Sequence, residues 1–108
     1  MVSEVIISEL AMNMLDDYIA YLLFEKKSEQ AAKNLILDAR ETKDKLLNVA
    51  ESLRYCDDDD LKRLGYRPIF FLKHNYLYIY RVDGNKAYIE AVYHQLQDYE
   101  NLFKRNNI

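Results

Sequence analysis

The sequence predicts an α+β domain with the element order β-α-α-β-β-β(-α), in which an antiparallel sheet packs on a helix hairpin. Two observations support this prediction. Apolar residues recur with a helical period over residues 8–53. Residues 65–99 contain three short runs rich in tyrosine, isoleucine and valine, which suit a half-buried strand. A chain of 108 residues has room for one core, so we expect a single domain over residues 1–108.

The N-terminal half is predicted to form one strand and two helices. Residues 2–7 form a short β-branched run of strand length. Ser8 is placed to cap a helix that runs to about Phe24, and Ser28 to cap a longer helix that ends near Leu53. Each helix has one apolar stripe and one polar side, which is the pattern of an antiparallel hairpin with one face on a core.

An acidic run, Asp57 to Asp60, follows the second helix. Calcium loops need carboxylates at alternating positions, a glycine at the turn and a glutamate beyond it, and this spacing is not present. We therefore interpret the run as a solvated loop and expect no metal and no cofactor. The one cysteine, Cys56, should have a raised pKa beside these carboxylates, so it is not proposed as a nucleophile.

The C-terminal half is predicted to form three strands and a short helix. The strands lie within residues 65–99 and are separated by turns at 74–75 and 83–85. Asp-Gly between two apolar runs is a strong hairpin signal, and Pro68 at the start of the first strand does least harm to the backbone pairing there. A final short helix is expected over residues 98–105.

The alternation of side chains along the last two strands predicts one face covered by the helices and one open face. The covered face would take Tyr78, Tyr80, Val82, Ala87, Ile89, Ala91 and Tyr93. The open face would take Leu77, Ile79, Arg81, Tyr88, Glu90, Val92 and His94. On this open face Leu77, Ile79 and Val92 would form an apolar strip, edged by Arg81 and Lys73, of the kind that a partner covers.

Composition and charge narrow the functional classes. The first ten residues lack the basic start of a signal peptide, and no apolar run approaches the ~20 residues that span a membrane. One cysteine fits a reducing compartment, so we expect a cytoplasmic protein. The net charge is −3, but residues 61–108 hold eight Lys and Arg against four Asp and Glu. This basic half would suit a phosphate backbone or an acidic partner, or reflect an uneven spread of solvated charges.

Three short motifs follow one another in the C-terminal half. They are Leu64-Gly65-x-Arg67, Tyr78-Ile79-Tyr80-Arg81-Val82-Asp83 and Ile89-x-x-Val92-x-His94-Gln95-x-x-Asp98. With the strand and helix hairpin before them, they resemble the RelE/ParE superfamily of toxins from type II toxin–antitoxin systems, over nearly the whole chain. The resemblance implies a curved antiparallel sheet on two helices and a cognate antitoxin. It implies two mechanisms, because RelE-like members cut messenger RNA at the ribosome whereas ParE-like members poison DNA gyrase without hydrolysis.

The resemblance also implies catalytic residues for an mRNA endonuclease. Cleavage without a metal needs an acid and a base, and a cation for the phosphorane charge. His94 occupies a position where several RNA-cleaving members carry a catalytic histidine. Arg81 or Arg67 would stabilise the charge, and Lys73 would contact the RNA. Leu77 stands where many such members have an arginine, so a gyrase poison for which His94 is dispensable stays an open alternative.

Arg81 and His94 also have purely structural interpretations. Arg81 would pair with Glu90 across the hairpin, and His94 would be a surface histidine at the end of the sheet. A non-toxic module that only binds an antitoxin is a further alternative. The antitoxin is assigned to the apolar strip, where a disordered acidic tail with scattered leucines would find apolar contacts and a basic rim. On this hypothesis Ile79→Asp would abolish antitoxin binding and leave the toxin folded.

Overall fold

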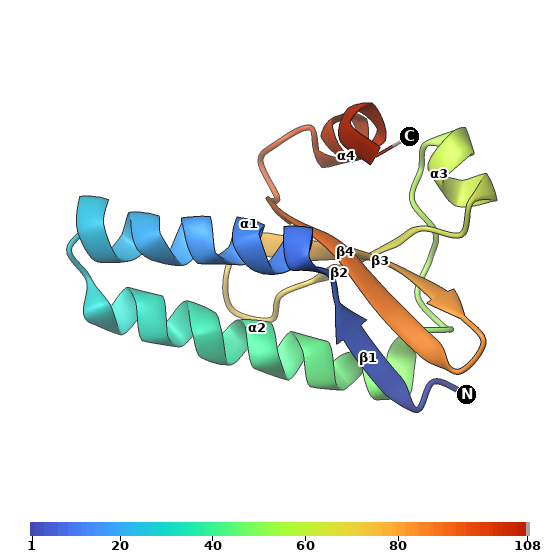
Figure 1. The fold of residues 1–108 in the computed structure, drawn as a ribbon, viewed down its shortest axis with the longest axis horizontal. Helices are drawn as coiled ribbons and strands as arrows, with labels where there is room; N and C mark the ends of the chain where they lie inside the picture. Colours follow the sequence, from blue (N-terminus) through green and yellow to red (C-terminus); the bar gives the residue numbers. More distant parts are fainter. Residues whose placement is uncertain (108) are drawn as a thin grey trace.

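The computed structural model describes residues 1–107 and shows a four-stranded sheet with a long helix hairpin on one face and two short helices on the other (Figure 1). The elements are β1 (Glu4–Ile7), α1 (Glu9–Ala20), a π-helical turn (Tyr21–Glu25), α2 (Glu29–Val49), α3 (Asp59–Arg63), β2 (Arg67–Phe70), β3 (Tyr76–Asp83), β4 (Lys86–His94) and α4 (Tyr99–Asn107). The predicted fold class and order are confirmed, and α3 is an additional helix. Within residues 1–107, no helix has the length and apolar character needed to cross a membrane.

Serine caps set the start of both long helices. The side chain of Ser8 accepts the N–H of Ala11 at 3.0 Å, and that of Ser28 accepts the N–H of Ala31 at 3.1 Å. Each cap satisfies one of the backbone donors that a helix start leaves unpaired. Both predicted caps are therefore confirmed, while α2 ends at Val49, four residues before the expected end.

The acidic run is a capped helix start instead of a solvated loop. Asp58 accepts the N–H groups of Asp60 and Leu61 at 3.0 and 3.1 Å, and α3 begins at the next residue. Carboxylates at a helix start are also favoured by the helix dipole. The solvated-loop interpretation overlooked this capping role. Across residues 1–107 the structure contains no cluster of three metal-ligating side chains.

The sheet has the strand order β1-β4-β3-β2. The β2–β3 and β3–β4 pairs are antiparallel, and Gly84 at a φ of 62° makes the tight turn between β3 and β4. The edge strand β1 pairs in parallel with β4, with Val5 beside Ala87. The sheet is therefore mostly antiparallel with one parallel edge, a detail that residue alternation does not encode.

A β-bulge in β4 reverses the two faces of that strand. The β3–β4 pairing skips Glu90, since Ile89 and Ala91 have partners in β3 and Glu90 has none. One extra residue shifts the period of two, so the side chains beyond it change faces. Val92 lies on the face of the helix hairpin, and Ala91 and Tyr93 lie on the opposite face. The predicted faces of β4 are wrong from Ala91 onward, because the alternation was continued through the bulge.

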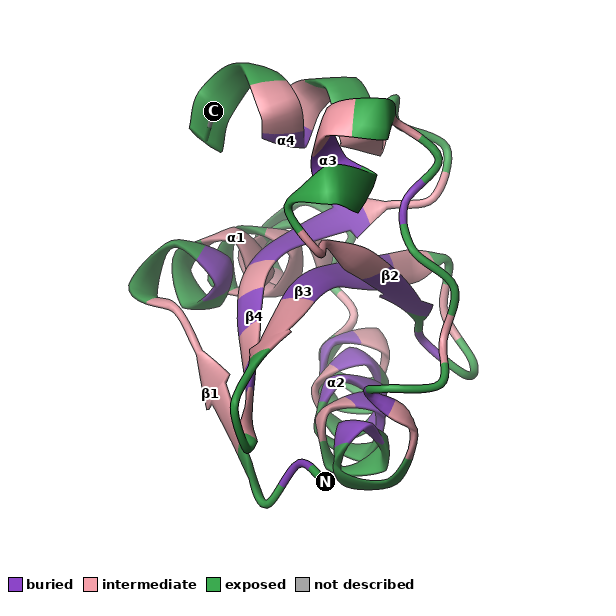
Figure 2. Cartoon of the chain, turned by 90° about the vertical axis from the view of Figure 1, so that its right-hand side faces the viewer, coloured by how far each residue is buried: buried purple, intermediate pink, exposed green. Residues whose placement is uncertain are grey.

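Two apolar clusters fill the two sides of the sheet. Figure 2 shows α2 on one side of the sheet and α3 and α4 on the other, with buried residues along the strands between them. The main core lies between the sheet and the helix hairpin. There, the hydroxyls of Tyr78 and Tyr80 donate to the carbonyls of Ala39 and Ala50 at 3.0 and 2.7 Å. Burial raises the pKa of Tyr80 to about 12, so this hydroxyl stays a donor at any physiological pH. These bonds explain why tyrosine, rather than phenylalanine, faces α2.

The second core lies on the opposite face, beneath α3 and α4. It comprises Cys56, Leu61, Leu77, Ile79, Ala91, Tyr93 and Phe103. The predicted open apolar strip does not exist, because Leu77 and Ile79 are buried here and Val92 is buried in the main core, each with 0% exposure. Ile79→Asp is therefore no test of an interface, since it would place a carboxylate inside the protein.

Candidate functional site

The two principal catalytic candidates lie on opposite faces of the sheet. His94 pairs with Tyr76, and their rings pack at 5.1 Å on the side of the helix hairpin. Arg81 pairs with Tyr88 of β4. Along β3, Arg81 lies five residues beyond Tyr76, which is about 17 Å at the rise of an antiparallel strand. It shares the face of Ile79, which lies in the second core. The expectation of a common face is wrong, because the bulge at Glu90 turns His94 over.

Arg81 already has partners that compensate its charge. Its guanidinium lies 3.6 Å from Glu90 and 3.9 Å from Asp83, and it stacks at 4.6 Å on the ring of Tyr88. The pairing with Glu90 across the hairpin is thus observed. Two neighbouring carboxylates oppose the approach of another anion.

Arg67 and Lys73 do not join the other candidates. Arg67 donates to the carbonyl of Leu53 at 2.7 Å and to the hydroxyl of Tyr55 at 2.9 Å, and it stacks on the Tyr55 ring at 4.1 Å. These contacts tie the loop after α2 to β2. Lys73 is exposed in the turn between β2 and β3. None of the hydrogen bonds or ion pairs found within residues 1–107 connects His94 to either cation.

His94 organises the loop that follows β4. Its Nδ1 accepts the N–H of Leu96 at 3.1 Å, which places the ring proton of the neutral form on Nε2. Its own backbone N–H donates to the side chain of Gln97 at 2.9 Å, and that side chain also accepts the hydroxyl of Tyr18 at 2.9 Å. These bonds match the structural interpretation of His94 at the end of the sheet.

Asp38 is an important residue that the sequence analysis missed. The helical pattern places it on the polar side of α2, yet it is 1% exposed. Its carboxylate accepts the N–H groups of Leu72 and Lys73 at 3.1 and 2.9 Å and contacts Nδ1 of His74 at 2.7 Å. Burial alone would raise the pKa of Asp38, but the hydrogen bonds from His74 and the two amides lower it below its ordinary value. Asp38 therefore fixes the β2–β3 turn to α2.

Removing this carboxylate should destabilise the protein in a pH-dependent way. Asp38→Asn should lower the free energy of unfolding at neutral pH by about 2–4 kcal/mol, since it weakens charge-assisted bonds to two amides. The folded-state pKa of Asp38 is lowered, so its contribution is complete above the unfolded pKa, about 3.9. It is lost as the pH falls through the folded value. Urea unfolding of wild type and variant between about pH 3 and pH 7 should show the difference shrink below about pH 4. A difference that stays constant across the series would contradict this role.

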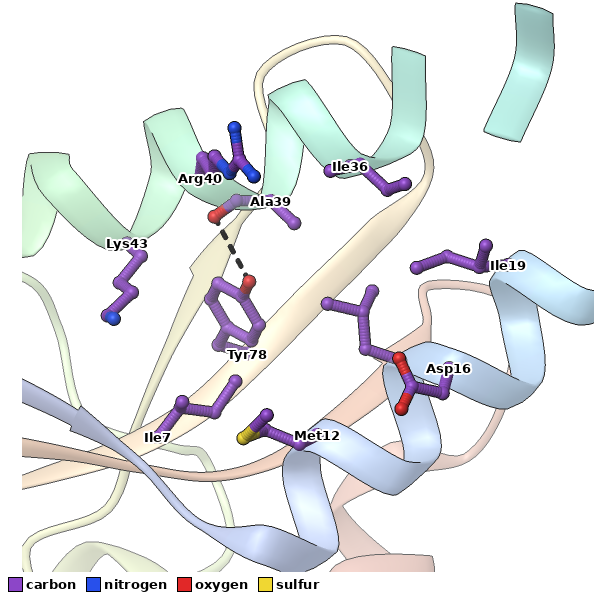
Figure 3. A pocket seen from close by; sticks show the side chains of 10 residues that line it. Ile7, Met12, Asp16, Ile19, Ile36, Ala39, Arg40, Lys43 and Tyr78 are labelled. Atoms are coloured by element: carbon purple, nitrogen blue, oxygen red, sulfur yellow. Dashed lines mark hydrogen bonds between the residues drawn. The ribbon is translucent and has the colours of Figure 1, made fainter. Parts of the chain in front are cut away.

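A groove of about 350 Å³ runs between α1 and α2 (Figure 3). Its floor is Tyr78 of β3, held by its bond to Ala39, and its walls come from the facing stripes of the two helices. The apolar lining is Ile7, Met12, Leu15, Ile19, Ile36, Ala39 and Tyr78. Met12 is 50% exposed at the edge, which is unusual for a large apolar side chain beside a core.

The rim of this groove is charged. Arg40 and Lys43 lie one turn apart on α2, and Asp16 lies on α1. Among the ion pairs found in residues 1–107, none includes Arg40 or Lys43. An apolar groove with two cations on one side, neither of them in an ion pair within residues 1–107, suits an amphipathic segment that carries carboxylates.

Comparisons with known proteins agree with the fold. A family model described as the ParE toxin of the type II toxin–antitoxin system parDE matches residues 5–99. A solved structure described as the chromosomal ParDE TA system from P. aeruginosa is similar, with a TM-score of 0.67 and 21% sequence identity. That match covers 87% of this chain and 96% of the other. No curated protein is significantly similar in sequence.

Proposed function

Because this chain belongs to the ParE family of toxins from type II toxin–antitoxin systems, we propose that it is a growth-inhibiting toxin directed at DNA gyrase, without hydrolase activity, and neutralised by a cognate antitoxin. The gyrase target is what ParE-like members imply. The observation that best supports a non-hydrolytic mechanism is the position of His94 and Arg81 on opposite faces of the sheet.

The distance between these residues matters because of what RNA cleavage requires. A general acid or base must lie within about 3 Å of the atom that gains or loses the proton, and the stabilising cation must reach the same phosphate. Side chains separated by about 17 Å along β3, with the sheet between them, do not meet at one phosphate. Leu77, at the usual arginine position, is buried in the second core and supplies no charge.

The antitoxin is best placed in the groove between α1 and α2. This groove replaces the apolar strip as the proposed interface, because Met12 at its edge is exposed and Ile7, Leu15, Ile19 and Ile36 are partly exposed, whereas the strip is buried. An acidic antitoxin segment with leucines on one side would bury those leucines against Met12 and Ile19. Its carboxylates would meet Arg40 and Lys43, which have no other ion partner within residues 1–107.

The histidine decides between the two mechanisms. His94→Ala should arrest growth as well as the wild type does when each is induced without antitoxin, because the proposed mechanism uses no general acid or base. Growth curves at matched protein levels measure this, and circular dichroism checks the fold. A nuclease would instead lose about 10²–10⁴ in rate. Loss of toxicity in a folded His94→Ala protein would therefore favour the RNA-cleaving mechanism.

A further inference from the structure

The helix hairpin projects beyond the sheet, and the turn between α1 and α2 forms its free end (Figure 1). Residues 21–27 of this turn are called the hairpin tip below. The tip begins with the π-helical turn, in which the N–H of Lys26 donates to the carbonyl of Tyr21 at 3.1 Å. Turns of this kind are rare and occur frequently at functional sites.

Two aromatic side chains are exposed at the hairpin tip. Phe24 is 74% exposed and Tyr21 is 48% exposed, whereas Leu22 between them packs against the main core. Among the large apolar side chains of residues 1–107, only Met1 at the N-terminus and Leu96 in the loop after β4 are more exposed than Phe24. Phe24 therefore contributes little to the core, and its ring is available to a partner.

The backbone of Lys27 is in an unfavourable conformation for a lysine. Its φ is 50°, and within residues 1–107 no other residue except glycine has a positive φ. A residue in this conformation after a helix cap is usually glycine, because glycine has no Cβ. The ammonium group of Lys27 takes part in none of the ion pairs found within residues 1–107. Lysine at this position thus lowers stability relative to glycine, and its side chain is free to bind a group outside the domain.

Positive charge lies beside the exposed rings. The Nζ of Lys26 is 5.7 Å from the centre of the Tyr21 ring, and Lys26 is also absent from the ion pairs found within residues 1–107. The positive end of the α2 dipole points toward the tip, and it stabilises Glu29 in the first turn of that helix. Two lysines next to exposed aromatic rings suit a partner that has carboxylates beside an apolar pocket.

A protein partner fits the hairpin tip better than a DNA backbone does. Proteins that bind DNA through its phosphates typically contact about 6–10 of them, and the tip offers two lysines. The net charge of −3 also opposes the approach of DNA. An exposed phenylalanine, by contrast, gains most when an apolar pocket removes it from water.

We propose that the hairpin tip is the surface through which this toxin binds its target, and that the target presents an apolar pocket for Phe24 with carboxylates near Lys26 and Lys27. The inference rests on the proposed function, in which the target is a protein subunit of DNA gyrase. The tip lies outside the groove assigned to the antitoxin, because the lining of that groove ends at Ile19 on α1 and begins at Ile36 on α2. Substitutions at the tip should therefore leave antitoxin binding intact.

Two substitutions at the tip test this surface. Phe24→Ala should abolish growth arrest when it is induced without antitoxin, and should weaken binding to purified gyrase, without DNA, at least about tenfold. Lys27→Gly should also weaken gyrase binding, yet raise the urea midpoint of unfolding, because glycine adopts the positive φ without strain. Both variants should bind the antitoxin as the wild type does, which verifies their fold. Leu37→Ala, at another exposed apolar residue of α2, should leave growth arrest and gyrase binding unchanged.

The outcomes separate the hairpin tip from the identity of the target. Growth arrest by Phe24→Ala equal to that of the wild type, at matched protein levels, would overturn the tip as the target surface. Loss of binding to a labelled DNA duplex, with unchanged binding to gyrase alone, would overturn the protein partner in favour of DNA. Loss of growth arrest in the tip variants, combined with a wild type that does not inhibit gyrase, would support the tip and contradict the gyrase target.

Discussion

Induced without its antitoxin, this protein should stop the growth of a bacterial host, and co-expression of the small protein encoded beside it should restore growth. The expectation follows from the ParE family match over residues 5–99. Colony counts after induction, with the soluble protein verified by immunoblot, measure the effect. Normal growth with abundant soluble protein would instead favour a module that binds an antitoxin and has no toxicity.

Neutralisation should fail when the groove between α1 and α2 carries a buried charge. Met12→Asp should weaken antitoxin binding by about 3 kcal/mol, or about a hundredfold in Kd, because the carboxylate is desolvated in the complex and lies in the apolar lining. Met12 is half exposed in the free protein, so the isolated toxin should stay folded. Titration calorimetry gives the affinity, and co-expression should no longer rescue growth.

A matched control separates the groove from the general effect of a new charge. Leu47 is also a partly exposed apolar residue on a long helix, but it lies outside the groove, so Leu47→Asp should bind antitoxin as the wild type does. Arg40→Glu should weaken binding in the same direction as Met12→Asp, through lost attraction to carboxylates. Equal affinity of wild type and Met12→Asp would place the antitoxin on another surface.

The predictable parts of the fold are those set by local chemistry. Ser8 and Ser28 cap helices because a hydroxyl before an apolar helical stripe satisfies a backbone donor three residues later. The Asp-Gly step makes the β3–β4 turn because glycine accepts a positive φ. Each of these signals lies within a few residues, so the order of elements can be read directly from the sequence.

The candidate site was less predictable because it depends on long-range pairing. Glu90, which has no backbone partner in β3, decides the faces of Ala91, Val92 and His94. The alternation of apolar and polar residues in the sequence does not reveal this bulge. This single shift turns His94 to the face opposite Arg81 and moves Val92 into the main core. The rest of the expected apolar strip, Leu77 and Ile79, is buried because α3 and α4 cover it.

Two other features also depend on contacts between residues far apart in the sequence. Asp38 looks like a solvated residue on α2 until the turn after β2 folds over it and supplies three donors. The raised pKa of Cys56 was predicted correctly, but burial is the largest cause, ahead of its acidic neighbours. In both cases the residues that cause the effect lie far away in the sequence: the β2–β3 turn for Asp38, and the strands and α4 that bury Cys56.

Purified protein in two parallel assays tests the proposed mechanism most directly: supercoiling by DNA gyrase, and cell-free translation of a reporter messenger RNA. We expect wild type and His94→Ala to inhibit gyrase equally, added antitoxin to reverse the inhibition, and neither protein to cut the messenger RNA. Cleaved messenger RNA with unimpaired gyrase, lost on His94→Ala substitution, would contradict it.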